Sequence, residues 1–340
     1  MTSKTINHIV WWIPFTKLRN DFRNYLRFKY LPYIPCLDIG LVKSFRKCIK
    51  EDKNFLSKYI NLIKNFDYDS VKILNDIVAK VCNYNNIEEE FYFNFYETKE
   101  LTKFILEYSK KIKKLNKNSY SYDKYILPTN HFEPETFYGK YGMDYIKNIN
   151  QVKNKNIIDA GGFIGDSAIV FSDYTDKNVY SFEPFLQNYN MIFKTIELNK
   201  KNNIIPVNIA LGDENKEIGM DASVGAGSGL SIENAKESNI NNIKNKVKMM
   251  TLDSYVKENN IEVGLIKTDL EGFEQPFLKG AIETIKEQKP VLIISIYHNY
   301  IDFFEIKPML ENLNLGYKFR IIRNKSPQLI TETKLLAEVY

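Results

Sequence analysis

Cysteine is scarce in this chain of 340 residues, which contains only Cys36, Cys48 and Cys82. An odd number of cysteines without the spacing of a metal motif predicts free thiols in a reducing compartment. Long apolar runs are missing too, because none approaches the roughly 18 residues of a membrane span. The short apolar run at 9–15 has no small-residue cleavage site after it, as a signal peptide would. We therefore expect a cytoplasmic protein.

A large charge of one sign is also lacking. The formal net charge is only +5, which argues against a dedicated nucleic-acid binder, so we expect no nucleic acid as a partner. The excess lies in residues 1–30, where six basic residues stand against one acidic residue. Aromatic residues alternate with these bases over 1–35, which favours peripheral contact with an anionic membrane at its inner face. An amphipathic helix docked on the protein itself or on a partner explains the pattern equally well.

The first third of the chain has helical periodicity. Residues 40–115 carry apolar stripes of helical spacing, the clearest formed by Leu101, Phe104, Ile105, Tyr108, Ile112 and Leu115. The polar stretch at 116–125 is turn-prone and is the best candidate for a boundary. We therefore predict a mainly helical N-terminal region at 1–125 and a second domain at 126–340.

Beyond residue 150, short β-branched runs alternate with amphipathic segments. The expected strands lie at 156–160, 178–184, 204–211, 263–269 and 290–297, and the expected helices near 165–173, 185–200, 273–287 and 302–313. Such alternation predicts a doubly wound, Rossmann-like α/β sheet. Two further runs, 317–323 and 333–340, have only a turn-like stretch between them. They predict a C-terminal hairpin, one strand of which runs antiparallel to the rest.

The dinucleotide fingerprint GxGxxG is absent, since residues 157–167, IIDAGGFIGDS, space their glycines as GGxxG. Ligands of such sheets bind at the carboxyl ends of the strands, where glycine lets the backbone approach closely. Asp159 and Asp166 flank the loop and would repel a pyrophosphate, whereas the sulfonium and ammonium of S-adenosylmethionine suit them. Glu183 follows about 20 residues later, a spacing that suits contact with ribose hydroxyls. The residues therefore favour S-adenosylmethionine, and an NAD-dependent oxidoreductase is the alternative.

Later strands end in further candidates at the same rim of the sheet. Asp269 and Glu271 follow the run at 263–269, and His298 follows the run at 290–297. Each could instead have a structural role, the two acids as caps of the next helix. Their gathering at one edge indicates a site.

Several ordered motifs make residues 150–340 similar to the FkbM-type family of S-adenosylmethionine-dependent methyltransferases. The family's DxGAxxGxxS is DAGGFIGDS here, with Gly162 where alanine is usual. Further matching motifs are SFEP (181–184), ALGD (210–213), TLDSYV (251–256), IKTDLEGFEQPFLKGA (266–281) and ISIYHNYIDFFEIKP (294–308).

The resemblance implies that the loop from Asp159 to Ser167 holds the methionine end of the cofactor, and that Glu183 holds its ribose. The cofactor-binding residues that we predict are Asp159, Gly161, Gly162, Phe163, Gly165, Ser167, Glu183, Pro184, Asn208, Ala210 and Asp269. It also implies O-methylation of a sugar hydroxyl in a bacterial surface glycan or its precursor, with a nucleotide-linked or lipid-linked sugar as acceptor. The alternatives are a non-catalytic S-adenosylmethionine-binding module and a methyltransferase acting on a small molecule or lipid.

A sugar hydroxyl does not ionise unaided at neutral pH, so its methylation requires a base. We predict that His298 is the general base, that Asp269 positions the acceptor or orients the histidine, and that Glu271 is the next candidate. A magnesium-type ion held by these three residues is an alternative to the base, and we favour the site without a metal. The small-residue loop at 223–231 is expected to close over the acceptor or merely to connect two strands.

Overall fold

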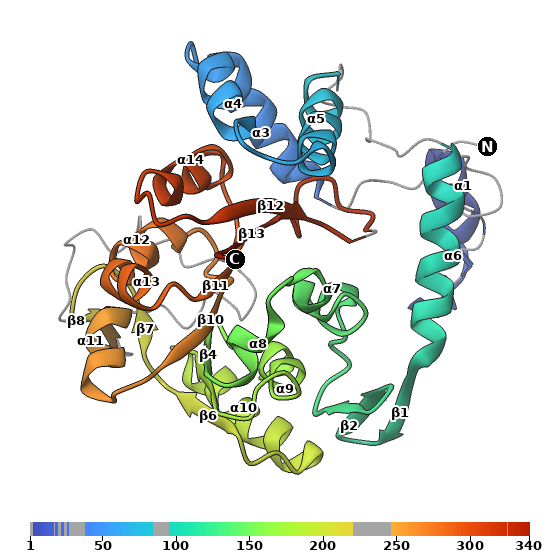
Figure 1. Ribbon diagram of the computed structural model, residues 1–340. Helices are drawn as coiled ribbons and strands as arrows, with labels where there is room; N and C mark the ends of the chain where they lie inside the picture. The colour runs from blue at the N-terminus through green and yellow to red at the C-terminus, as the bar shows by residue number, and fades with distance from the viewer. Residues whose placement is uncertain are drawn as a thin grey trace.

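We describe the protein from a computed structural model (Figure 1). The described residues are 3–16, 18–19, 22–23, 26, 38–83, 95–219, 246–324 and 326–340. Three features named above therefore lie wholly or partly outside them: Cys36, the loop at 223–231 and part of the basic segment at 1–35. Within the described residues, Cys48 and Cys82 are free thiols, as predicted.

The N-terminal third is mainly helical, as expected. Its helices are α1 (Ser3–Trp11), α3 (Ile39–Glu51), α4 (Phe55–Ile63), α5 (Tyr68–Asn83) and α6 (Phe95–Lys111). A small antiparallel sheet then follows, with strands β1 (Ile112–Asn116), β2 (Ser119–Tyr122) and β3 (Tyr125–Leu127). The prediction of helix up to 115 is therefore wrong for residues 112–115, which form β1, and the polar stretch at 116–125 contains two turns between short strands. The short two-residue turns and the alternating tyrosines of 119–125 suit a β-meander, whose buried face carries Tyr122 and Tyr125.

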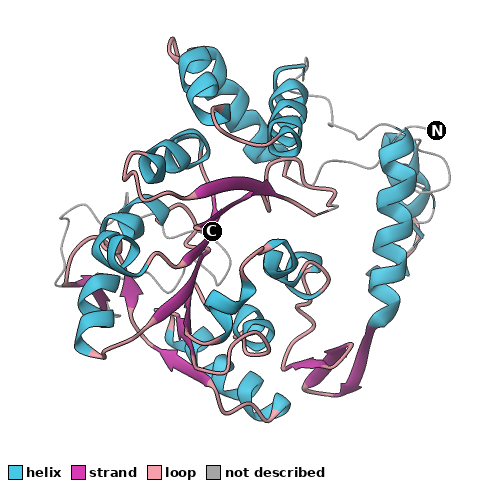
Figure 2. Cartoon of the chain, in the orientation of Figure 1, coloured by secondary structure: helices cyan, strands magenta, loops and turns pink. Residues whose placement is uncertain are grey.

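A seven-stranded sheet forms the centre of the molecule (Figures 1 and 2). Its strands, in spatial order, are β12 (Lys318–Ile322), β13 (Lys334–Glu338), β11 (Val291–Ser295), β10 (Val263–Thr268), β4 (Asn156–Ala160), β5 (Val179–Phe182) and β6 (Ile204–Val207). The neighbours from β11 to β6 pair in parallel, while β13 runs antiparallel to both β11 and β12. The predicted doubly wound sheet and its antiparallel hairpin are both confirmed.

Helices cover both faces of this sheet. They are α7 (Pro134–Phe137), the 3₁₀ helix η1 (Lys140–Tyr145), α8 (Ile149–Lys153), α9 (Asp166–Phe171), α10 (Leu186–Asn199), α11 (Leu252–Glu258), α12 (Glu274–Lys279), α13 (Ile282–Gln288) and α14 (Tyr300–Glu311). Successive strand residues point to opposite faces, so Ile157 packs with α8, α9 and α10, while Ile158 packs with α11 to α14. Burial on both faces explains why these strands read as continuous apolar runs.

Two expected elements are divided in the structure. The run at 204–211 gives β6 and then β7 (Ala210–Leu211), which joins a separate small sheet with β8 (Lys216–Gly219) and β9 (Lys246–Met250). Asn208 lies at this division, and its amide donates to the carbonyls of Glu183 and Pro184. The expected helix at 273–287 is divided into α12 and α13 at Gly280, where an added Cβ would lie 2.0 Å from the carbonyl oxygen of Gly212.

The helical region shares a core with the central sheet. Val42, Phe45 and Leu74 of α3 and α5 belong to the same apolar cluster as Ile294 of β11 and Phe303 of α14. The Ile321 amide of β12 donates to the Ser70 hydroxyl of α5 at 2.8 Å, which fixes this helix on the sheet. The division at residue 125 stays a prediction of domain boundaries, but α3 to α5 pack directly on the hairpin side of the sheet.

Candidate active site

The glycine loop connects β4 to α9 with three residues in the left-handed region. Gly161 has φ +85°, Phe163 has φ +45° and Gly165 has φ +83°. A Cβ on Gly161 would lie 2.0 Å from the carbonyl oxygen of Asp269, so two of the predicted site residues are in close contact through their backbones. A Cβ on Gly165 would press on Ile192 and Thr195 of α10. The first glycine thus permits a close approach between loops, and the last permits packing of loop against helix.

Asp159 supports this loop from beneath. It is fully buried, pairs with Lys267 Nζ at 2.9 Å and accepts hydrogen bonds from the hydroxyls of Ser167 and Ser181. Lys267 also donates to the Gly161 carbonyl at 2.7 Å. Burial alone would lower the pKa of Lys267, but the charge of Asp159 raises it, so the ammonium group stays protonated. The groups in contact with the Asp159 carboxylate are therefore protein groups of the loop and its neighbouring strands.

The glycine at 162 has a local explanation. A Cβ at this position would lie 2.0 Å from Ser181 Oγ on the adjacent strand β5. That hydroxyl is itself fixed, since it donates to Asp159 at 2.9 Å. An alanine at 162 would therefore require Ser181 to move, and the departure from the family's usual alanine follows from the serine on β5.

Glu183 closes the loop on its other side. One carboxylate oxygen accepts from the Phe163 amide at 2.9 Å and the other from the Phe185 amide at 2.9 Å. Burial raises the pKa of Glu183 to about 7, although these amides and Asn188 act against that rise. Its oxygens retain lone pairs for further donors such as hydroxyl groups. Asn208 holds the turn after Glu183 through two backbone carbonyls.

The loop, Glu183 and the later strand ends open onto one cavity of about 530 Å³. A volume of this size is typical of small-molecule sites. The predicted site residues that line it are Gly161, Phe163, Ser167, Glu183, Pro184, Ala210, Asp269, Glu271 and His298. Asp159, Gly162, Gly165 and Asn208 are not among the lining residues; they support those that are. The sheet thus brings residues from five separate stretches of sequence to a single cavity.

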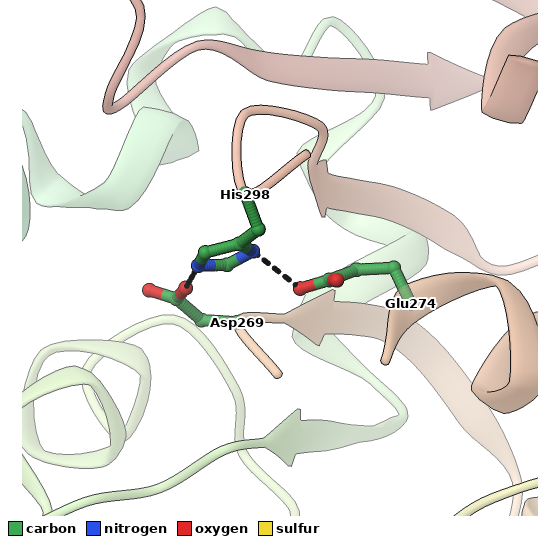
Figure 3. A group of neighbouring side chains, drawn as sticks. All are labelled: Asp269, Glu274 and His298. Carbon is green, nitrogen blue, oxygen red and sulfur yellow. Dashed lines mark ion pairs between the residues drawn. The ribbon is translucent and has the colours of Figure 1, made fainter. Parts of the chain in front are cut away.

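His298 lies between two carboxylates (Figure 3). Its Nε2 is 3.1 Å from Asp269 Oδ1, and its Nδ1 is 2.9 Å from Glu274 Oε1. Both distances are those of close ion pairs when the ring is protonated. Burial would lower the pKa of His298, but the charge of Glu274 and the contact with Asp269 raise it well above 6.5. As arranged here, the ring therefore favours the protonated form.

Glu274 holds both the histidine and the loop before it. It is fully buried at the start of α12, and its carboxylate accepts from the amides of Leu270 and Gly272. Glu271 lies between these two amides with φ +55°, and its carboxylate is 3.8 Å from His298 Nε2. Burial and the neighbouring Asp269 raise the pKa of Glu271. The residue that orients His298 from behind is thus Glu274, while Asp269 lies on its cavity side.

Two tyrosines hold Asp269. The Tyr297 hydroxyl donates to one carboxylate oxygen at 3.0 Å, and the Tyr141 hydroxyl donates to the other at 2.9 Å. The Tyr141 ring lies 5.1 Å from Lys267 Nζ and 4.3 Å from Lys334 Nζ, so two buried ammonium groups fix its position. Burial would raise the pKa of Asp269, but the contact and charge of His298, together with both lysines, hold it well below its usual range.

The cavity wall carries further carboxylates. Glu133 and Glu332 line it with Glu271. Burial and the charge of Glu332 raise the pKa of Glu133 to about 8. Burial also raises the pKa of Glu332, although Lys334 lies 2.6 Å away and opposes that rise. These side chains offer several hydrogen-bond acceptors to a polar acceptor molecule.

Several residues of this site were not predicted from the sequence, among them Glu133, Tyr141, Lys267 and Glu274. Lys267 and Glu274 stand inside the motif at 266–281, so the motif could have indicated them. Tyr141 and Glu133 precede the glycine loop, and only the folded chain brings them to the sheet's edge. Tyr141 has φ +52°, between Lys140 at +47° and Gly142 at +87°, and no sequence signal marks this turn.

A divalent ion at this site stays a hypothesis. The ligand atoms of Asp269, Glu274 and His298 all lie within 4.8 Å of one another. Both ring nitrogens of His298 already face carboxylates, however, and both Glu274 oxygens accept backbone amides. An ion would have to replace these contacts rather than complete an open set of ligands.

The sheet order with its antiparallel hairpin is that of class I methyltransferases. Residues 159–319 match the family model of the methyltransferase FkbM domain. This match confirms, over these residues, the family resemblance that the motifs predicted. None of the curated proteins matches the chain.

Solved structures of methyltransferases resemble this chain, one of them with a TM-score that shows the same fold. A methyltransferase FkbM from Methylobacillus flagellatus is 17% identical, with a TM-score of 0.55 over 86% of this chain. This chain spans only 60% of that protein's length. An rRNA methylase from Streptococcus thermophilus is 16% identical over 59% of this chain and 95% of its own, with a TM-score of 0.37. TYW2 of M. jannaschii in complex with AdoMet is 16% identical over 67% of this chain and 84% of its own, with a TM-score of 0.34.

Proposed function

We propose that the protein is an S-adenosylmethionine-dependent O-methyltransferase that methylates a sugar hydroxyl of a bacterial surface glycan or of its precursor. One observation carries the proposal: the glycine loop and the histidine held by two carboxylates line the same cavity. A methyl donor on the loop and a base on the opposite rim would meet there. The match to the FkbM domain over 159–319 supports methyl transfer in general.

The loop residues fit S-adenosylmethionine. Gly161 and Phe163 bring backbone to the cavity wall, and the buried Glu183 presents acceptor oxygens to it. Hydroxyl donors of a ribose would offset the burial that raises the pKa of Glu183. Asp166 is a second carboxylate of the wall, and burial raises its pKa as well. Both acids would be stabilised by a ligand that is cationic and rich in hydroxyls.

When bound, S-adenosylmethionine supplies an electrophilic methyl group. The task left to the protein is to align an acceptor hydroxyl and remove its proton. In this proposal the hydroxyl replaces Asp269 as the neighbour of His298 Nε2, while Glu274 keeps hold of Nδ1–H. The neutral ring then takes the hydroxyl proton on Nε2, so His298 must first release the proton that its two carboxylates favour. Asp269, fixed by Tyr141 and Tyr297, stays ionised and accepts a second donor of the acceptor.

A sugar acceptor suits the carboxylates of the cavity wall. Sugar hydroxyls are donors, and Glu133, Glu271 and Glu332 are among the residues that line the cavity. The proposal that the acceptor is a glycan comes from the family resemblance. Which sugar accepts the methyl group must be identified by experiment.

The test is methyl transfer by the purified full chain. Surface glycans are incubated with S-adenosylmethionine in the presence or absence of the protein and are then compared by mass spectrometry. The expected difference is one methyl group on a sugar oxygen. His298→Ala serves as the matched inactive protein. Binding of S-adenosylhomocysteine without any methylated glycan would favour a non-catalytic binding module. A methyl group on a lipid or small molecule would keep the methyltransferase but replace the acceptor.

A further inference from the structure

The N-terminal segment exposes an unusual number of aromatic side chains. Exposed fractions are 65% for Trp11, 73% for Trp12, 70% for Phe15 and 57% for Leu18. With Ile9 and Phe22, these make six of the seventeen large exposed apolar side chains among the described residues, and the six lie within fourteen positions. Scattered exposed apolar residues are normal, but a contiguous group marks an interaction surface. We call these six residues the aromatic patch.

The aromatic patch is not a misplaced part of the protein's own core. The opposite side of the same segment is already packed, since Ile6 and Val10 are fully buried with Leu26 and in contact with Ile13. The segment therefore has an inner face with its own apolar cluster and an outer face left in solvent. Helix α1 lies at the edge of the molecule in Figure 1, behind α6.

The charge of the segment identifies the partner. Residues 1–30 contain six basic residues, Lys4, Lys17, Arg19, Arg23, Arg27 and Lys29, against Asp21 alone. This excess equals the net charge of the whole chain, so the other 310 residues sum to about zero. Tryptophan beside basic residues favours the boundary between anionic lipid headgroups and acyl chains. A protein partner would need a matching acidic groove, whereas an anionic bilayer offers charge and apolar depth together.

We propose that the aromatic patch docks the protein on an anionic membrane surface. The patch lies on the membrane rather than crossing it: among the described residues, no helix is long and apolar enough to cross. Trp12 and Phe15 enter the headgroup boundary, and the net positive charge of residues 1–30 attracts the anionic lipids. This inference does not depend on the proposed methylation, because it concerns only where the protein binds.

Vesicle flotation of the full chain tests the inference. Vesicles of phosphatidylcholine alone are compared with vesicles of phosphatidylcholine and phosphatidylglycerol. We expect binding to the anionic vesicles, at least about tenfold weaker binding to the neutral ones, and a loss of binding as salt rises above about 0.1 M. Equal binding to both vesicles, or no binding to either, would overturn the proposal.

Matched variants locate the surface. Trp12→Ala/Phe15→Ala should lower binding to anionic vesicles by about tenfold or more, because both side chains are exposed and their removal costs no internal packing. Leu56→Ala/Tyr68→Ala is the control, since these side chains are exposed to 66% and 79% on other helices. Circular dichroism checks that all proteins are folded. Unchanged binding by the first variant, or an equal loss in the control, would contradict docking through the aromatic patch.

Discussion

The glycine loop and the histidine side of the cavity differ in how far apart their parts lie in the sequence. The loop is formed by residues 159–167 with Glu183 and Ser181 from the next strand, all within 25 positions. The histidine side joins Tyr141, Asp269, Glu274 and His298, which span more than 150 positions. A local site can be inferred from a motif, whereas a site assembled by the sheet needs the topology. The predictions below test whether the two sides are also separate in their effects.

The largest effect is expected for His298→Ala. Removing a general base typically lowers the rate by about 10²–10⁴-fold, and the glycine loop does not contact this side chain. We expect kcat to fall by that factor at saturating acceptor, while the Kd of S-adenosylhomocysteine from isothermal titration stays within about twofold of wild type. An unchanged kcat would contradict the assignment of His298 as the base. A loss of cofactor affinity would show that the histidine side also contributes to cofactor binding.

Tyr141→Phe removes one donor to Asp269 and leaves the ring between Lys267 and Lys334. A hydrogen bond to a charged group is worth about 1.5–3 kcal/mol, so kcat/KM should fall by about tenfold or more. Tyr145→Phe is the control, because that side chain lies in the same 3₁₀ helix and is 44% exposed. If both variants lost activity equally, the bond from Tyr141 to Asp269 would have no special role.

Gly162→Ala tests the loop without touching the histidine side. The added Cβ would displace Ser181, which is bonded to Asp159, so cofactor binding should weaken by about fivefold to tenfold. Gly162→Ala/Ser181→Ala removes the opposing hydroxyl and should restore most of the affinity. A double variant as weak as the single one would show that the contact with Ser181 is not the reason for glycine.

The smallest effect is a shift in pH dependence. Only neutral His298 accepts a proton, and Glu274 and Asp269 raise its pKa above 6.5, so activity should increase with pH and reach half its maximum above 6.5. Glu274→Gln removes one negative charge and thereby lowers the pKa of His298. The half-maximum should then move to lower pH. A shift to higher pH would contradict the role of Glu274 as the carboxylate that holds the ring.

Much of the fold follows from local patterns. The β-branched runs at 156–160 and 290–297 became β4 and β11 because each strand is buried on both faces. The sequence pattern did not predict where a single tertiary contact interrupts an element. Asn208 lies where one predicted strand is divided, and Gly280 approaches Gly212 where one predicted helix is divided. At 112–125, where Ile112 and Leu115 suggested the end of a helix and the polar stretch suggested a turn, the chain forms a small sheet instead.

The site shows the same limit. Every predicted residue lies in the cavity wall or directly behind it, because all of them stand at strand ends or in the motif loops. The structural role of each residue could not be predicted. Asp159 supports the loop through Lys267, and His298 is held by Glu274 rather than by Asp269 alone. These assignments depend on side chains from different strands, which only the register of β4, β10 and β11 places together.

Binding of S-adenosylhomocysteine to the full chain tests the central claim most directly. Isothermal titration is run with S-adenosylhomocysteine and with NAD, for the wild type and for Glu183→Ala. We predict one site for S-adenosylhomocysteine, about tenfold or more weakened in the variant, and no comparable binding of NAD. Tighter binding of NAD, or binding of S-adenosylhomocysteine that does not respond to the loss of Glu183, would contradict the assignment of this cavity.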